Sequence, residues 1–130
     1  MNTPLDIADL PDSLAELVEL LGEHAVLKLM DSWGGVRLYV PQKMTPDHVI
    51  ARVIGFASAR RLSARFPLEF LEVPRGADAL RRARNRGIVR AHAEGLSASR
   101  LARKHRLTER QVWKILAASD SPDSPQQDLF

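Results

Sequence analysis

Residues 97–116 read SASRLARKHRLTERQVWKIL, and this stretch decides the fold of the C-terminal part of the chain. Leu101 and Ala102 indicate a short first helix, because two helices that cross closely need a small residue such as Ala102 at the contact. A turn is expected at residues 105–107, with Leu107 folded inward. Arg106 falls where the backbone is left-handed, and a residue other than glycine there costs roughly 1 kcal/mol. The pattern predicts two short helices joined by a tight turn.

A second helix is expected to begin after Thr108. The run Thr108-Glu109-Arg110-Gln111 fits a capping box, in which the Thr and Gln side chains satisfy each other's free backbone amides. Val112, Ile115 and Leu116 then recur at helical spacing and form one apolar, inward-facing side. The spacing predicts a helix-turn-helix, a motif whose second helix lies in the major groove of DNA.

The outward-facing residues of this segment are candidates for DNA contact, and most are basic. Four surround the turn, where phosphates lie in the docked motif: Arg100, Arg103, Lys104 and Arg106. Six more start the second helix or project from it toward the groove: Thr108, Glu109, Arg110, Gln111, Trp113 and Lys114. Arg110 matches guanine O6 and N7, Gln111 matches adenine N6 and N7, and Glu109 can accept from cytosine N4 or cap the helix dipole. Trp113 has no inward role and is expected against a sugar or a thymine methyl group.

Charge is distributed unevenly along the 130 residues, although the net charge is only +3. Residues 75–118 hold 12 Lys and Arg against 3 Asp and Glu, a net charge of +9. Residues 1–74 hold 7 against 10, and residues 119–130 hold none against 3, so each flanking region has a net charge of −3. A short segment with this excess of cations indicates a polyanionic partner, although basic helices can also be simply solvated.

Two upstream segments, residues 16–41 and 49–74, align without a gap at an offset of 33 residues. The identical pairs are Gly22/Gly55, Leu29/Leu62, Leu38/Leu71, Val40/Val73 and Pro41/Pro74. Each segment is expected to form a helix, a glycine break, a second helix and a short strand that ends at proline, with the strands at residues 36–40 and 70–74. Helix starts are expected at Pro11-Asp12-Ser13 and at Thr45-Pro46, and Trp33 and Phe66 are expected in the core.

The expected fold is mainly α. An N-terminal helical repeat with short β-strands, residues 1–74, forms the dimerisation region, and a helix-turn-helix domain follows at residues 75–118. A supporting helix over residues 77–94, stopped by Gly95, belongs to that domain. Residues 119–130 are polar, acidic and rich in proline and serine, which predicts a disordered acidic tail.

Several function classes lack support in the sequence. There is no cysteine, so disulfides and thiolate metal sites are excluded, and the four histidines at positions 24, 48, 92 and 105 are scattered and are expected at the surface. No glycine-rich phosphate loop, catalytic constellation or membrane-length apolar run is present. We therefore expect a cytoplasmic protein that is not an enzyme, without cofactor or metal and without a membrane partner.

The chain resembles the Mor transcription activator family, named for the middle-operon regulator of Mu-like phages. The resemblance rests on the run GGVRLYVP at residues 34–41 and on the predicted helix-turn-helix within residues 84–116, and with the repeat helices it covers residues 14–117. It implies a homodimer with an N-terminal core of helices and strands, paired helix-turn-helix domains on double-stranded DNA, and contact with RNA polymerase at phage or prophage promoters.

The second strand departs from the family motif, because it lacks the glycine pair and carries Glu72 where the tyrosine is expected. The intact motif places Arg37 and Tyr39 in the first strand, where they either contact DNA or pack a dimer strand. Two other functions stay open beside transcription regulation. One is a helix-turn-helix accessory of a recombination or transposition system, and the other is an antirepressor module that binds protein.

Overall fold

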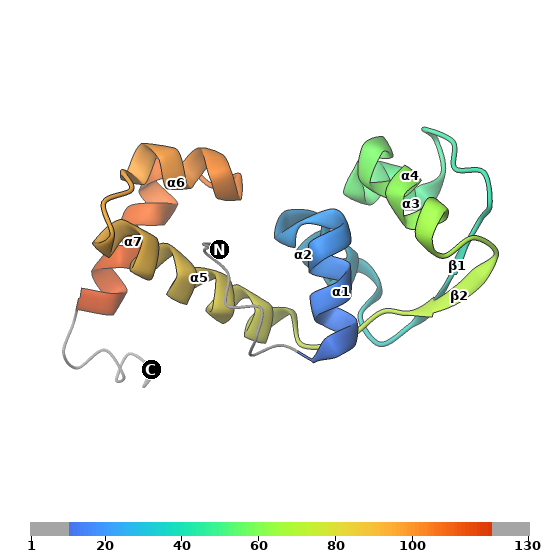
Figure 1. The fold of residues 1–130 in the computed structure, drawn as a ribbon, viewed down its shortest axis with the longest axis horizontal. Coiled ribbons are helices and arrows are strands. Elements are labelled where there is room, and N and C mark those ends of the chain that lie inside the picture. Colours follow the sequence, from blue (N-terminus) through green and yellow to red (C-terminus); the bar gives the residue numbers. More distant parts are fainter. Residues whose placement is uncertain (1–10, 121–130) are drawn as a thin grey trace. The chain divides into compact units, whose positions relative to one another are not determined.

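The computed structural model describes residues 11–120, and within them the fold is mainly helical, with seven helices and one two-stranded sheet (Figure 1). In chain order the elements are α1 (Asp12–Leu21), α2 (Glu23–Trp33), β1 (Arg37–Val40), α3 (Val49–Ile54), α4 (Phe56–Arg65), β2 (Glu69–Glu72), α5 (Ala77–Ala93), α6 (Ala98–His105) and α7 (Glu109–Asp120). The described chain divides into two compact units, residues 11–81 and 82–120. The first turn of α5 belongs to the first unit.

A glycine joins the two helices in each half of the first unit. Gly22, at φ +87°, separates α1 from α2; its N–H donates to Val18 O at 2.8 Å, and its carbonyl accepts from Val26 N at 3.2 Å. Gly55, at φ +93°, does the same between α3 and α4, with Ala51 O and Ala59 N as partners. All three positions of the second junction lie 33 residues beyond those of the first. Only glycine adopts this positive φ readily, so the predicted helix breaks are confirmed.

The apolar side chains that recur at helical spacing face the core of the first unit. In α1 these are Leu14, Leu17, Val18 and Leu21, and in α2 they include Val26, Leu27 and Met30. From the second half, Ile50 and Leu62 are completely buried. Trp33 and Phe66, which end α2 and follow α4, are only half-buried, so the expectation that both belong to the core is met only in part.

Of the two helix starts predicted in the first unit, the first is confirmed, because α1 begins at Asp12, and the second was wrong. At the second start, residues 45–48 form a turn, and α3 begins at Val49 because His48 caps it: its Nδ1 accepts from Ile50 N at 3.1 Å. Thr45 instead donates its hydroxyl to Asp47 Oδ1 at 2.7 Å, and this bond lowers the pKa of that carboxyl. At the first start, Pro11 itself precedes α1, and no side chain caps the helix.

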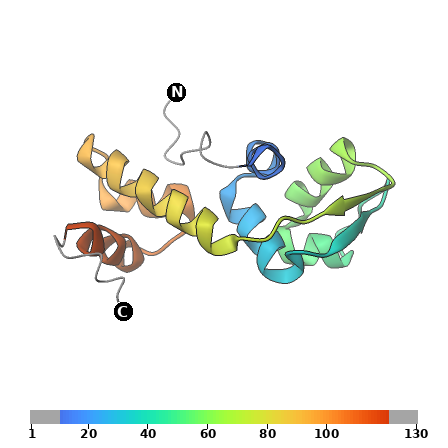
Figure 2. The same ribbon diagram turned by 90° about the horizontal axis from the view of Figure 1, so that it is seen from below.

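The two short strands pair with each other in antiparallel orientation (Figure 2). Leu38 lies opposite Leu71, and Tyr39 lies opposite Phe70. The strands are shorter than predicted, since β1 omits Val36 and β2 ends at Glu72. Val40 is buried, whereas the alternate residues Arg37, Tyr39, Phe70 and Glu72 are exposed. The sheet therefore has one covered face and one open face, as a two-stranded antiparallel sheet allows.

The glycine pair before β1 has a structural role. Gly34 N donates to Met30 O at 2.8 Å and ends α2, and Gly35 N donates to Val73 O at 2.8 Å and ties the turn to the segment after β2. A Cβ on Gly34 would lie 2.7 Å from Met30 O, and a Cβ on Gly35 would collide with the Arg75 side chain. Gly34 needs glycine because the Met30 carbonyl lies close, whereas Gly35 needs it chiefly for its positive φ of 84°, since the end of the Arg75 side chain can move.

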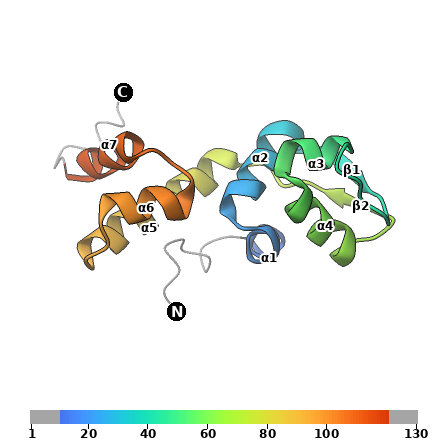
Figure 3. The ribbon, with the colours of Figure 1, turned by 90° about the horizontal axis from the view of Figure 1, so that it is seen from above.

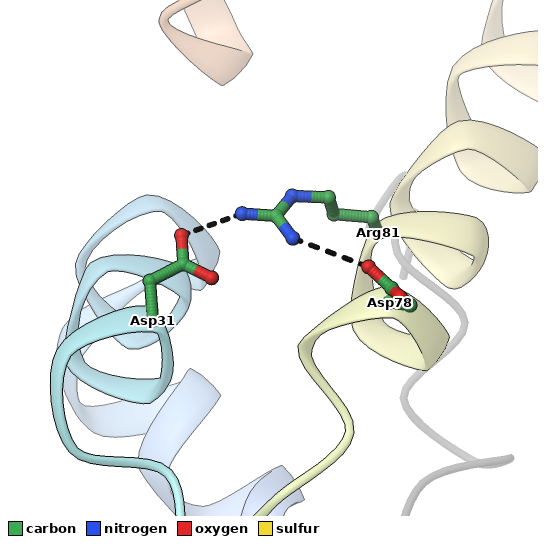
Figure 4. Close-up of polar contacts among 3 residues, drawn as sticks. All are labelled: Asp31, Asp78 and Arg81. Carbon is green, nitrogen blue, oxygen red and sulfur yellow. Dashed lines mark hydrogen bonds and ion pairs between the residues drawn. The ribbon is translucent and has the colours of Figure 1, made fainter.

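An ion pair fastens the first turn of α5 to α2 (Figure 4). Arg81 Nη2 lies 2.6 Å from Asp31 Oδ2, and Arg81 Nη1 lies 3.4 Å from Asp78 Oδ1 in the same turn. The Asp31 and Asp78 side chains are 50% and 86% exposed and the Arg81 side chain is 38% exposed, so this pairing contributes little to stability.

The second unit is built from α6, α7 and the rest of α5 (Figure 3). Its core consists of Ile88, Ala98, Leu101, Ala102, Val112 and Leu116, with Leu107 and Ile115 packed against it. Gly95, at φ +111°, follows the supporting helix as predicted. Ser119 and Asp120 belong to α7, which corrects the predicted start of the tail, and the remaining tail residues, 121–130, lie outside the described residues. Across residues 11–120 no helix combines the length and apolar character that a membrane span needs.

Candidate nucleic-acid interface

The helix α6 separates its apolar and basic residues sharply. Ser97 caps it, with its Oγ accepting from Arg100 N at 3.1 Å. Leu101 and Ala102 are buried on the inner side, as predicted. Three cations occupy the exposed side: Arg100, Arg103 and Lys104. The Arg103 guanidinium donates to Ser99 Oγ at 3.1 Å, which holds it along the helix surface.

The turn after α6 has the predicted left-handed residue. Arg106 has φ 57° and ψ 45°, and the N–H groups of Arg106 and Leu107 both donate to Ala102 O. This arrangement closes the helix and directs Leu107 back toward the core. The prediction of a surface position for His105 was wrong, because the residue is only 3% exposed.

The capping box at the start of α7 is confirmed. Gln111 N donates to Thr108 Oγ1 at 3.0 Å, and Thr108 N donates to Gln111 Oε1 at 2.9 Å. The capping box occupies the Gln111 carbonyl oxygen that bidentate pairing with adenine would need. Gln111 was predicted both to cap α7 and to pair with adenine, and in the structure it caps the helix.

All ten site residues predicted in this unit are exposed: Arg100, Arg103, Lys104, Arg106, Thr108, Glu109, Arg110, Gln111, Trp113 and Lys114. On α7 the residues Arg110, Trp113 and Lys114 lie on the side away from the buried Val112 and Leu116. Glu109 lies in the first turn of α7, where its negative charge interacts favourably with the positive end of the helix dipole. The exposed surface is rich in cations, since residues 82–120 hold 10 Lys and Arg against 3 Asp and Glu.

One neighbour of the exposed α7 surface could not be predicted from local spacing. The Trp113 ring meets the His92 ring of α5 edge-on, with centroids 5.7 Å apart and an interplanar angle of 80°. His92 Nδ1 lies 3.0 Å from Leu96 O. The two aromatic residues are 21 positions apart, so only the packing of α5 against α7 brings them together.

Arg37 and Tyr39 belong to the other compact unit and are joined there by Phe70. The Tyr39 and Phe70 rings have centroids 5.3 Å apart, and the Arg37 guanidinium lies 5.0 Å from the Phe70 centroid. This cluster forms the open face of the sheet. Phe70 is a member that sequence analysis missed, because only the strand register places it opposite Tyr39.

Three of the described histidines serve the fold individually. His48 caps α3, His92 contacts the Leu96 carbonyl, and His105 is buried at the end of α6. Within residues 11–120 no group of three or more His, Asp or Glu side chains is placed to hold a metal ion.

These features define a small, mainly helical protein with one electrically balanced unit and one strongly basic three-helix unit. The chain belongs to the Mor transcription activator family, whose family model matches residues 43–129. No curated protein and no solved structure matches it. The resemblance inferred from sequence is confirmed, and the family is one of transcription regulators.

The matched range is not the one expected from the sequence. It contains α3, α4, β2 and the whole basic unit, but it begins after residues 34–41, which carry the glycine pair and Tyr39. Membership therefore rests on the second helix-helix-strand segment and the basic unit. The roles of Arg37 and Tyr39 have to be argued from their own surroundings.

Proposed function

We propose that this protein is a sequence-specific DNA-binding transcription activator whose residues 98–120 act as a helix-turn-helix. The observation that carries the proposal is the pair α6 and α7: the left-handed Arg106 turn and the Thr108–Gln111 cap join two short helices whose outer side presents cations and Trp113. Family membership supports regulation of transcription, and phage or prophage promoters are the expected targets.

In this proposal the residues around the turn bind phosphate. Arg100, Arg103, Lys104 and Arg106 are exposed on α6 and its C-terminal turn, where the DNA backbone passes in the docked motif. Such contacts fix the register of α7 on the duplex and supply affinity that does not depend on sequence.

Base choice would reside mainly in α7. Arg110 carries the planar guanidinium that pairs with guanine O6 and N7, and Lys114 follows one turn later on the same side. Thr108 and Gln111 define where the helix starts, and Glu109 stabilises its N-terminus, so these three contribute chiefly by orienting α7.

The decisive experiment is a binding selection on randomised duplex DNA with the wild type and Arg110→Ala side by side. We expect the variant to bind the selected site about 5- to 150-fold more weakly, equivalent to about 1–3 kcal/mol, and to lose preference at one base pair. Arg52→Ala, an exposed arginine of α3, is the matched control and should recover the wild-type motif. Identical motifs from wild type and Arg110→Ala would remove Arg110 from base readout, and no enrichment by the wild type would defeat DNA recognition itself.

We further propose that the protein acts as a homodimer through residues 11–74. One α6–α7 pair per chain reads one half-site, and a two-fold axis brings two of them to grooves roughly 34 Å apart. Since β1 and β2 pair within one chain, a dimer does not need to exchange these strands. The open sheet face supports a contact with a second copy, because Tyr39 and Phe70 are 45% and 59% exposed.

Sedimentation tests the dimer and also the role of the sheet face. The wild type should sediment as a dimer at micromolar concentration, and Tyr39→Ser with Phe70→Ser should shift it toward the monomer. Val49→Ser, which changes an equally exposed apolar residue of α3, is the control. A double variant that stays dimeric but loses DNA affinity would assign Tyr39, Phe70 and the neighbouring Arg37 to DNA instead.

Contact with RNA polymerase is part of the proposal through the family alone, and we assign it no surface.

A further inference from the structure

We propose that His92 is a positioning residue that holds the Trp113 indole in the orientation in which it meets DNA. This inference rests on the proposed DNA-binding role of α7 and adds a residue from a different helix to it. His92 lies in the last turn of the supporting helix α5, outside α6 and α7.

The exposure of Trp113 is the first step of the argument. Its side chain is 51% exposed, although a tryptophan in so small a unit is a large apolar group that burial would favour. It lies one turn after Arg110 and next to Lys114 on the outer side of α7. An exposed indole between two cations suits contact with a sugar or a base methyl group, but a freely rotating indole would lose that freedom on binding.

A polar contact to the backbone orients the His92 ring. Its Nδ1 lies 3.0 Å from the Leu96 carbonyl oxygen, which can only accept a hydrogen bond. The Nδ1 atom therefore carries the proton and donates, which fixes both the tautomer and the plane of the ring. Leu96 follows the Gly95 turn, whose φ of 111° brings the chain back toward α5.

The contact between the two rings restricts the orientation of the Trp113 indole. The centroids are 5.7 Å apart and the planes are inclined by 80°, the edge-to-face arrangement that aromatic quadrupoles favour. The path from the Leu96 carbonyl through His92 to Trp113 lies entirely within the compact unit of residues 82–120. One side of the indole faces the protein, which leaves the other side oriented for DNA.

A double-mutant cycle on DNA affinity tests the proposal. His92→Ala should weaken binding of the selected site about 2- to 12-fold, the range expected from the loss of one aromatic contact. In a Trp113→Ala background the same change should have no further effect, because the residue that His92 orients is absent. His92→Phe keeps an aromatic ring beside Trp113 but lacks the hydrogen bond to Leu96, so it should restore only part of the affinity. An equal loss from His92→Ala in both backgrounds would show that His92 acts through the fold alone and would overturn the proposal.

A measurement without DNA separates this inference from the proposed function. In a Trp33→Phe background Trp113 is the sole tryptophan, since the chain has 2. His92→Ala should lower its fluorescence anisotropy and increase its quenching by iodide, while His92→Phe, which keeps the ring but not the hydrogen bond to Leu96, should give values between those of His92→Ala and the wild type. Unchanged fluorescence would overturn the positioning role, even if DNA binding is confirmed. Fluorescence that changes as expected in a protein that does not bind DNA would leave His92 orienting Trp113 and would defeat the proposed function alone.

Discussion

The two compact units differ most clearly in how they use charge. Residues 11–81 hold 9 Lys and Arg and 9 Asp and Glu, and cations of this unit pair across helices, Arg65 with Glu16 and Arg81 with Asp31. Residues 82–120 hold 10 Lys and Arg against 3 Asp and Glu. A balanced unit has no long-range attraction for a polyanion, whereas the second unit carries a positive field. The difference locates the proposed DNA contact in residues 82–120.

Exposed apolar side chains follow the opposite distribution. In the first unit Val36, Tyr39, Leu68 and Phe70 are all more than two-fifths exposed, and they lie on or beside the two strands. In the second unit Trp113 is the exposed large apolar side chain, and it lies between cations. Large exposed apolar patches usually mark contacts with protein. The comparison therefore favours a first unit that binds another copy and a second unit that binds DNA.

Removal of cations from the second unit should have the largest effect. Changing Arg100, Arg103 and Lys104 together to Ala should lower DNA affinity roughly 100- to 1,000-fold near 0.1 M salt, because each lost phosphate contact removes about 0.9 from the slope of log K against log salt. The slope should become shallower by about 2.7. Titrations at several salt concentrations measure both quantities.

The matched control removes three exposed arginines from the balanced unit, Arg52, Arg60 and Arg61. It should leave the salt slope unchanged if the comparison between the units is sound. An equal decrease of the salt slope in the two triple variants would show that both units contact DNA. It would contradict the assignment of DNA binding to residues 82–120 alone.

Local chemistry explains which parts of the fold were predictable. Gly22 and Gly55 break helices because of their own backbone freedom, and Thr108 caps α7 through a residue three positions away. Such signals are contained in a few neighbouring residues. The predicted start of α3 was wrong because two local signals compete. Thr45-Pro46 is a good start signal, but His48 can also cap a helix, and α3 begins after this later cap.

The candidate site was predictable in its exposure but not in its contacts. All the outward-facing residues of α6 and α7 follow from helical periodicity once Leu101, Val112 and Leu116 are taken as the core. The burial of His105, the edge contact of His92 with Trp113 and the pairing of Tyr39 with Phe70 depend on how separate elements pack. A histidine carries no local signal that distinguishes core from surface, so these contacts require the structure.

A backbone clash in the first unit should have an intermediate effect that tests whether the units unfold separately. Gly34→Ala would place a Cβ 2.7 Å from Met30 O, and we expect it to lower the free energy of unfolding by about 1–3 kcal/mol. Trp33 reports on the first unit in a Trp113→Phe background, and Trp113 reports on the second in a Trp33→Phe background. Urea denaturation should shift the Trp33 transition, and a smaller shift at Trp113 would mean that the units unfold independently.

Gly76→Ala provides the control for this prediction. It has no atom within 4 Å of an added Cβ, but its φ is +97°, so it isolates backbone strain from steric clash. Its effect should be near 1 kcal/mol and smaller than that of Gly34→Ala. A larger effect at Gly76 would show that the approach of Gly34 to Met30 O destabilises the unit less than backbone strain does.

The smallest effect is expected from the ion pair at the first turn of α5. Arg81 connects Asp78 of its own turn with Asp31 of α2, and the Arg81 and Asp31 side chains are 38% and 50% exposed. Exposed pairs of this kind contribute roughly 0–1 kcal/mol, and salt screens them. Arg81→Ala should therefore shift the Trp33 urea transition slightly at low salt and not at about 1 M salt. Arg82→Ala, which removes the next and equally helical arginine, should leave the transition unchanged at both. Arg81→Ala could instead lower the free energy of unfolding by several kcal/mol at both salt concentrations. That result would show that the aliphatic part of the Arg81 side chain, and not its charge, holds the turn against α2 by packing.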